Sequence, residues 1–313
     1  MIPPAEHFVG PPHWEWYILL YFFFAGLSGG SYALATLLRH WGAPHDAAAA
    51  RLGFLIAFPA VVVCPILLSI DLGQPIRFWH MMVSTTPDAS GLNFKYWSPM
   101  SVGVWALLIY GLFATVSFLE TLVLDRVWRG WLADRLAGVM RVIHLPFNIA
   151  GTVFGLFIAS YTGVLLSVSN QPIWSDTWTL GGLFLVSGLS GSAALIMLSA
   201  RYRPAATGSE GWLQAVDRYF VLLEMVLLVA FLVTVGLAGT LGTALGFPWL
   251  LLWVLAVISL LLPLTDIPQL RVPPLQVAGR AITVVEATRV ALPALVLVGV
   301  LALRMAVIFS AQG

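Results

Sequence analysis

Eight predominantly apolar runs, each long enough to cross a lipid bilayer, constrain this chain more than any other feature. A helix of roughly 20 residues spans the ~30 Å hydrocarbon core, and apolar runs of about 18 residues or more indicate such helices. Only 9% of the 313 residues are charged, whereas soluble domains carry about 25%. The sequence therefore predicts an all-α integral membrane protein with eight transmembrane helices, at about 17–38, 52–70, 100–124, 142–167, 178–199, 219–241, 247–264 and 290–310.

Arginine and lysine alternate between the two sets of loops, and this alternation predicts the orientation of the chain. The loops that follow the first, third, fifth and seventh runs carry two, four, three and three of these residues, while the opposite loops carry only Arg77 and Lys95. Basic loops face the cytoplasm. Residues 1–16 are therefore expected to form an external N-terminal segment, residues 17–313 a single membrane domain, and both termini to lie outside.

Small residues recur in three of the runs. AGLSGGSYAL at 25–34 and SGLSGSAAL at 187–195 are similar, which either reflects a duplication into two four-helix bundles or two ordinary packing faces. The fourth run repeats a small residue every fourth position, a row expected to hold a neighbouring helix close: Gly151, Gly155, Ala159 and Gly163.

Polar side chains gather at the outer ends of the first four runs. Tyr21 and Tyr161 lie about one turn inside, Asp71 ends the second run and Ser98 precedes the third. An unpaired polar group costs several kcal/mol in hydrocarbon, so their common depth predicts a shared polar pocket just below the outer surface. Alternatively, the aromatic residues are interface anchors and Asp71 caps its helix and pairs with Arg77.

Ionisable residues inside the other runs are candidates for function by default. Glu120 lies within a turn of the cytoplasmic end, from which it is expected to reach Arg126. Arg304 lies about two-thirds of the way along the last run and requires an internal anion or carbonyl as a partner, whereas Glu224, early in the sixth run, is expected to lie at too different a depth to pair with it. Together, Glu120, Glu224 and Arg304 outline a proton path.

Metal cofactors are not expected in this chain. A b-type haem between helices needs paired histidines, and only His144 falls inside a run. The single cysteine, Cys64, excludes an iron–sulfur cluster bound by about four thiolates. No haem, iron–sulfur cluster or metal site is therefore predicted.

Six motifs follow one another from about residue 14 to the end: WEWYILLYFFFAGLSGGSYALA, DLGQPIRFW, WSPMSVGVW, SYTGVLLSVSNQPIW, SGLSGSAAL and ALRMAVIFSAQG. In this order they resemble the polysulfide reductase membrane-subunit family, also called NrfD-like. The resemblance implies an eight-helix subunit of the bacterial inner (plasma) membrane without its own redox metal, whose outer side faces the periplasm. It also implies two partners, a periplasmic four-cluster iron–sulfur subunit and a molybdopterin catalytic subunit, and electron exchange with menaquinone or ubiquinone.

The family's quinone pocket uses a polar residue of the first helix and the tyrosine of the YTG-like motif, which fall on Tyr21 and Tyr161 here. Some members carry histidine in place of Tyr21, and tyrosine donates a hydrogen bond but accepts protons poorly at neutral pH. We therefore expect Asp71 or His80 to accept the protons of a quinol, with Arg77 holding the carboxylate charged.

The leading functional hypothesis is a quinone-binding membrane anchor, active as the quinol-oxidising or quinone-reducing part of a larger oxidoreductase. DLGQPIRFWHM, residues 71–81, would form the outer lip of the pocket and the seat of the iron–sulfur partner. Two alternatives are a transporter or proton-conducting subunit and a purely structural anchor.

Overall fold

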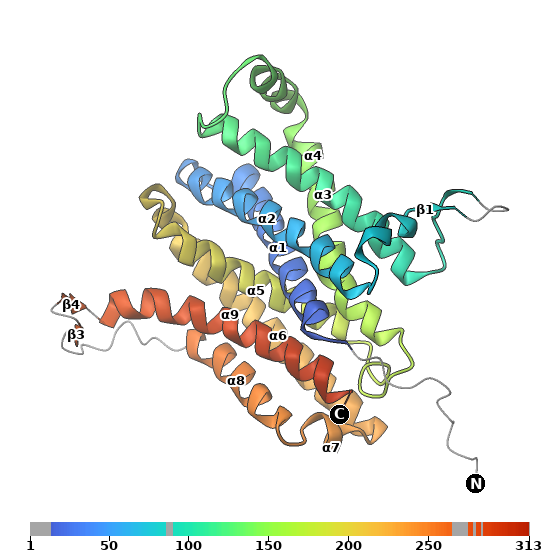
Figure 1. Cartoon of the computed structure of the whole chain (residues 1–313). Helices are drawn as coiled ribbons and strands as arrows, with labels where there is room; N and C mark the ends of the chain where they lie inside the picture. The colour runs from blue at the N-terminus through green and yellow to red at the C-terminus, as the bar shows by residue number, and fades with distance from the viewer. Residues whose placement is uncertain (1–13, 86–89, 265–274, 278–279, 283, 313) are drawn as a thin grey trace, which may run out of the picture.

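Long helices run side by side through the computed structural model of this protein, which describes residues 14–85, 90–264, 275–277, 280–282 and 284–312 (Figure 1). Seven helices in the described part of the chain are long and apolar enough to cross a membrane. The expectation of an all-α integral membrane protein is therefore confirmed. Most of the predicted external segment, residues 1–13, lies outside the described residues.

The helices are α1 (Trp16–Trp41), α2 (Ala47–Asp71), α3 (Pro99–Leu124), α4 (Trp131–Ser167), α5 (Leu180–Ala200), α6 (Glu210–Ala238), α7 (Leu241–Ala244), α8 (Trp249–Leu261) and α9 (Val284–Ser310). Short 3₁₀ segments occupy the connections: η1 (Pro44–Asp46), η2 (Pro75–Met81), η3 (Pro204–Ser209) and η4 (Leu262–Leu264). Two antiparallel hairpins pair β1 (Val83–Ser84) with β2 (Gly91–Leu92) and β3 (Leu275–Val277) with β4 (Arg280–Ile282).

The seventh predicted run, 247–264, differs from the others in length. Its α-helical part, α8, has 13 residues, and at about 1.5 Å per residue it is shorter than the hydrocarbon core. It packs against α9, as Figure 1 shows. The other seven predicted runs correspond to the seven long helices.

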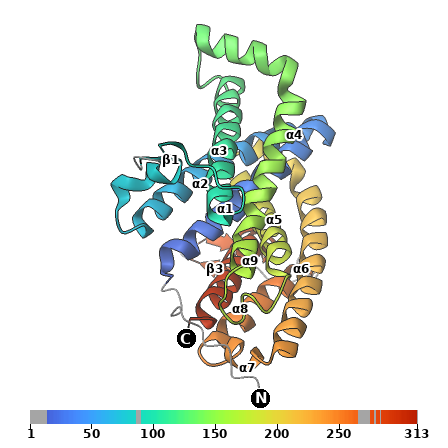
Figure 2. The same ribbon diagram turned by 90° about the vertical axis from the view of Figure 1, so that its right-hand side faces the viewer.

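Two helices begin well before the apolar runs that predict them. α4 begins at Trp131 rather than at 142, and α6 at Glu210 rather than at 219. Their first turns mix charged and apolar residues, so an apolar-run criterion detects only the later, lipid-facing part. Figure 2 shows that the first part of α4 bends away from the rest, and Pro146 inside the helix explains this bend because it donates no hydrogen bond to the carbonyl four residues earlier.

α1 and α5 form the centre of the molecule. α1 packs against α2, α4 and α5, and α5 packs against α1, α4, α6 and α9. The two helices cross at equivalent positions of the two small-residue motifs, where a Cβ on Gly188 would lie only 3.0 Å from the Gly26 Cα. The predicted small-residue row of α4 is confirmed as a packing face, since Gly155 lies against Gly29 of α1 and Gly163 against the Leu180 carbonyl.

The two described ends of the chain meet at one end of the bundle. The Trp14 amide donates to the Gln312 side chain (2.8 Å), and the Gln171 side chain donates to the Ala311 carbonyl (2.5 Å). The Trp174 indole donates to the Val307 carbonyl (2.8 Å) and stacks on Trp14. The QPIW part of the fourth motif is thus a clamp that ties the α4–α5 loop to both ends of the chain.

At the opposite end, ion pairs join the basic loops. The Asp125 carboxylate forms ion pairs with Arg51 (3.0 Å) and with Arg203 (2.6 Å), which come from α2 and from the segment before η3. The Ser209 hydroxyl donates to Asp46 (2.6 Å). Because these contacts connect the first three helices to the α5–α6 loop, they fix the two parts of the chain relative to each other.

Candidate functional site

The two tyrosines predicted to share a pocket lie close together at the end of the bundle where the chain begins. Tyr21 of α1 and Tyr161 of α4 are both buried, and these two helices pack against each other. The Tyr161 hydroxyl donates to the Pro99 carbonyl at the start of α3 (2.7 Å), and its ring lies where a side chain on Gly103 would be. The absence of a side chain at Gly103 therefore allows Tyr161 to approach α3.

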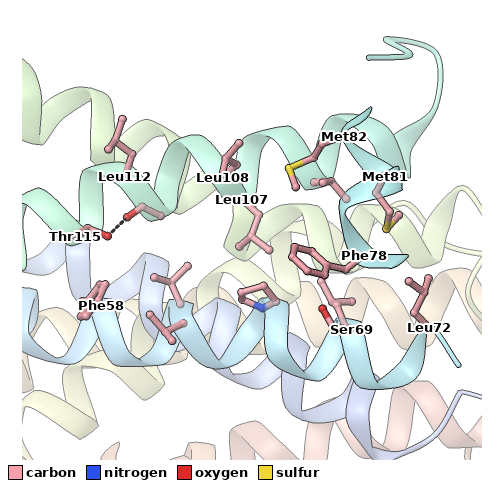
Figure 3. A pocket seen from close by; sticks show the side chains of 16 residues that line it. Phe58, Ser69, Leu72, Phe78, Met81, Met82, Leu107, Leu108, Leu112 and Thr115 are labelled. Carbon is pink, nitrogen blue, oxygen red and sulfur yellow. Dashed lines mark hydrogen bonds between the residues drawn. The ribbon is translucent and has the colours of Figure 1, made fainter. Parts of the chain in front are cut away.

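A crevice of about 420 Å³ lies between α2 and α3, below η2 (Figure 3). Its lining is almost wholly apolar. The polar side chains in the lining are Thr115, which donates to the Gly111 carbonyl (2.6 Å), and Ser69, which lies beside Phe78 at the η2 end of the crevice. This volume falls in the usual range for small-molecule pockets, roughly 300–1,000 Å³.

The two tyrosine residues contact the helices that form the walls of this crevice. Tyr161 packs on Gly103, the neighbour of Val104, which lines the crevice on α3. The Tyr21 carbonyl accepts a weak bond from the Cys64 thiol (3.9 Å), and the residue after Cys64 lines the crevice on α2. These contacts place the Tyr161 ring against α3 and the backbone of Tyr21 against α2.

Pro65 leaves one backbone carbonyl of the crevice wall without its usual hydrogen-bond donor. Proline has no N–H, so the carbonyl four residues earlier in a helix lacks its usual backbone donor. That carbonyl belongs to Val61, and both residues line the crevice. The wall thus contains a backbone acceptor as well as the Ser69 hydroxyl.

The remaining predicted site residues belong to the lip, η2 and its flanks. Asp71 and Arg77 are exposed and His80 is half-buried. Arg77 and His80 line a separate hollow of about 450 Å³. In the described part of the chain, Arg77 forms no ion pair with Asp71; the charged neighbour of Asp71 is the Glu15 carboxylate. The expectation that Arg77 holds Asp71 charged is therefore wrong.

Glu120 has a different partner from the one predicted. Arg39 of α1 donates to both of its carboxylate oxygens, at 2.7 and 2.6 Å, so the expected contact with Arg126 is replaced by a bidentate pair across α1 and α3. The prediction failed because Arg39 falls beyond the end of the first apolar run, whereas α1 continues to Trp41.

Arg304 lies fully buried where α9 meets α1 and α5. It donates to the carbonyls of Phe22 (3.3 Å), Phe184 (3.0 Å) and Val300 (3.1 Å) and to the Ser187 hydroxyl (2.9 Å). The prediction that this residue needs an internal carbonyl partner is confirmed. These four acceptors disperse its charge without a carboxylate in direct contact.

Two buried carboxylates follow one face of α6. Glu224 is 1% exposed, and its Oε2 atom has no hydrogen-bond partner in the described part of the chain. Asp217 accepts from the Ser190 hydroxyl (2.6 Å) and was not singled out from the sequence. It precedes Glu224 by seven residues, about two helical turns, so the two side chains lie on the same face of α6. This spacing is the sequence feature from which Asp217 could have been identified.

Two half-buried histidines also meet at the end of the bundle opposite the lip, although the sequence suggested only one. His40 belongs to α1, and its ring stacks on His144 of α4 with 5.0 Å between ring centroids. Their faces rather than their nitrogens are turned toward each other, which is not the arrangement of axial haem ligands. Among the described residues, no group of three His, Cys, Asp or Glu side chains is placed to hold a metal ion.

Similarity to a known protein family extends over nearly the whole sequence. Residues 7–313 match the family described as Polysulphide reductase, NrfD. Protein NrfD of Escherichia coli (strain K12) is 26% identical over 72% of each protein. The C chain of the polysulfide reductase of Wolinella succinogenes is 29% identical over 72% of this protein and 70% of its own length. The C subunit of the tetrathionate reductase of Salmonella typhimurium is 27% identical over 60% of this protein and 49% of its own length.

Proposed function

The chain belongs to the polysulphide reductase NrfD family, and from that premise we propose that it is the quinone-reactive membrane subunit of a molybdopterin oxidoreductase complex. It exchanges electrons between menaquinone or ubiquinone and a periplasmic four-cluster iron–sulfur subunit. The relatives named as parts of reductases support such an assembly. Within it, this chain is the quinol-oxidising or quinone-reducing part.

The observation that carries this proposal is the apolar crevice between α2 and α3, together with Tyr161 packed on Gly103 of α3. A quinone joins a long apolar tail to a ring with two oxygen atoms. An apolar channel that opens between helices suits the tail, and a small number of polar groups at one end suits the ring. The tail therefore lies along the crevice, with the ring at its outer end.

Hydrogen bonds at the outer end hold the ring. The hydroxyl groups of Ser69, Tyr21 and Tyr161 are able to donate to a quinone oxygen, and the Val61 carbonyl is able to accept from a quinol hydroxyl. Tyr161 donates to Pro99 in the present structure, so it must turn from that carbonyl to donate to the ring.

Protons leave toward the lip. Oxidation of a quinol releases two electrons and two protons, and the acceptor of a proton needs contact with water. Asp71 and His80 meet this condition because they stand at the exposed end of α2 and on η2. Arg77 lies on the same segment and keeps the lip positively charged, although it does not pair with Asp71.

Eight crossings, with the termini and the lip on the periplasmic side, complete the proposal. Thr240, just after α6, donates to Asp176 of the α4–α5 loop (2.7 Å), and Gln171 of that loop contacts Ala311, just after α9. α6 and α9 thus end on the same face, so the segment between them must return to the other face. α8 is the segment that runs this way, and the concentration of arginine at the opposite loops supports a cytoplasmic position for them.

Replacing Tyr161 by phenylalanine tests the site. We expect Tyr161→Phe to lower quinol turnover roughly tenfold, equivalent to about 1.4 kcal/mol. The complex should still assemble, because one neutral hydrogen bond contributes only about 1 kcal/mol to stability. Ser160→Ala is the matched control, since Ser160 likewise donates to a backbone carbonyl, that of Gly181, but toward α5. Equal quinol turnover in both variants and the native protein would refute the role of Tyr161.

A second candidate function, proton movement across the membrane, is favoured by the buried carboxylates of α6. A carboxyl group with one unpartnered oxygen, such as Glu224, takes up and releases a proton more readily than one held in a bidentate pair. Glu224, Asp217 and Arg304 would form this path. Glu120 would contribute only where its pair with Arg39 opens. This function predicts that the charge of Glu224 affects proton movement and leaves quinone binding intact.

A further inference from the structure

The hollow on the lip is built from basic and polar side chains, unlike the crevice below it. Arg77, His80 and Lys95 line it together with Asn93. The hollow and the crevice share Leu72 and Met81 as a wall. A molecule seated in the hollow would therefore lie directly above the outer end of the crevice.

The cations of the hollow have no anionic partner in the described part of the chain. Arg77 and Lys95 are exposed, and neither forms an ion pair with a described residue. The carboxylate of this connection, Asp88, lies outside the described residues. The first turn of α3, a 26-residue helix capped by Ser98, adds the positive end of its dipole.

Hydrogen bonds to Asn93 fix the two walls of the hollow relative to each other. The backbone N–H of Asn93 donates to the Met82 carbonyl (2.7 Å). The backbone carbonyl of Asn93 accepts from the Trp105 indole (3.2 Å) and from the Ser101 hydroxyl (3.3 Å). The Lys95 amide donates to the same hydroxyl (3.0 Å). Because these hydrogen bonds already hold the walls in place, binding of a partner does not carry the conformational entropy cost of ordering them.

Large, exposed side chains adjoin the lining residues of the hollow in the sequence. Ile76 is 87% exposed, Tyr96 77% and Trp97 66%. Exposed aromatic residues and arginine are enriched at protein interfaces. Tyr and Trp also anchor proteins at the lipid surface, but unpaired cations collected in a concave site above the crevice favour a protein carboxylate over a lipid.

We propose that this hollow receives an acidic segment of the iron–sulfur partner, with its carboxylates paired to Arg77 and Lys95. The proposal rests on the proposed function and adds the chemistry of the contact to it. Docking here would place the electron acceptor above the shared wall of Leu72 and Met81, next to the outer end of the crevice. It would also make assembly of the complex sensitive to salt.

Lys95 provides a residue-specific test because it is the single lysine of the protein. A carbodiimide joins a lysine amine to a carboxylate as an amide, and the reagent itself takes up the water that is lost. Treatment of the assembled complex in native membranes should link this protein to the iron–sulfur subunit through Lys95 and an Asp or Glu, identified by mass spectrometry. Lys95→Arg keeps the charge but lacks a reactive amine, so this link should vanish while the complex remains.

Charge reversal gives an independent measurement. We expect Arg77→Glu combined with Lys95→Glu to lower the amount of co-purified iron–sulfur subunit by about tenfold or more, because like charges across an interface repel. Arg129→Glu is the matched control, an exposed arginine at the opposite end of the bundle, and should leave co-purification unchanged.

The outcomes separate this proposal from the proposed function. If no iron–sulfur subunit accompanies the native protein, both proposals fall. If the complex purifies and oxidises quinol but Lys95 forms no link, or links only to a lipid carboxylate, the docking site is wrong and the proposed function stands. Unchanged co-purification of the charge-reversed variant would likewise overturn the docking site.

Discussion

Three buried ionisable side chains distinguish the α5–α6–α9 part of the protein. Arg304 is surrounded by carbonyl and hydroxyl acceptors, Asp217 is held by Ser190, and one oxygen of Glu224 has no partner among the described residues. Burying a charge without a partner is costly, so such a group persists in a membrane protein mainly where function requires it. Glu224 is therefore the residue on which proton movement is best tested.

Glu224→Gln should separate proton movement from quinol oxidation. The amide keeps the shape of the side chain but cannot exchange a proton. In proteoliposomes that contain the assembled complex, we expect fewer protons moved per quinol oxidised, and an oxidation rate within about twofold of the native one, or about 0.4 kcal/mol. Glu210→Gln, on the same helix near its polar start, is the control. An unaltered proton ratio in Glu224→Gln would exclude the path.

At the scale of elements, the α2–α3 pair combines features that keep a crevice open. Pro59 and Pro65 interrupt the hydrogen-bond ladder of α2, and Gly111 leaves the facing surface of α3 without a side chain. A Cβ added at Gly111 would meet no protein atom within 4 Å. Closing this space by a side chain should therefore affect the ligand rather than the fold.

Gly111→Phe is expected to raise the quinol KM roughly tenfold, equivalent to about 1.4 kcal/mol of lost binding. Its benzyl group would occupy the crevice, and replacing a helical glycine does not weaken the helix. Gly138→Phe is the matched control, because Gly138 is also a helical glycine with open space around it but lies in the first part of α4. The quinol KM of both variants and of the native protein is measured by steady-state kinetics. Equal KM values in Gly111→Phe and the native protein would show that the crevice does not bind quinol.

The helices could be predicted from the sequence to a large extent, because hydrocarbon imposes a minimum length on an apolar helix. The same rule could not locate the polar first turns of α4 and α6. The partners of side chains were harder to predict. Arg39 reaches Glu120 from another helix, and Ser69 belongs to the site only because η2 folds back over α2. Such contacts depend on how helices pack, which apolar periodicity does not encode.

At the scale of the whole molecule, both described ends of the chain, the α4–α5 loop and the lip share one end, and the paired arginines occupy the other. Substituted cysteines test which end faces the periplasm. Ser175 is exposed in the α4–α5 loop and Thr207 in η3, while Cys64, the native thiol, is fully buried. A membrane-impermeant maleimide should label Ser175→Cys in intact cells and Thr207→Cys only after lysis. The reverse pattern would invert the proposed orientation.

Photolabelling of the assembled complex with an azidoquinone tests the quinone site most directly. We predict that mass spectrometry finds the label on the crevice walls of α2, α3 and η2, for example at Leu108 or Met82, and that excess unlabelled quinol displaces it. Label concentrated on α6 and α9, or spread over all lipid-facing helices without competition by quinol, would contradict the account.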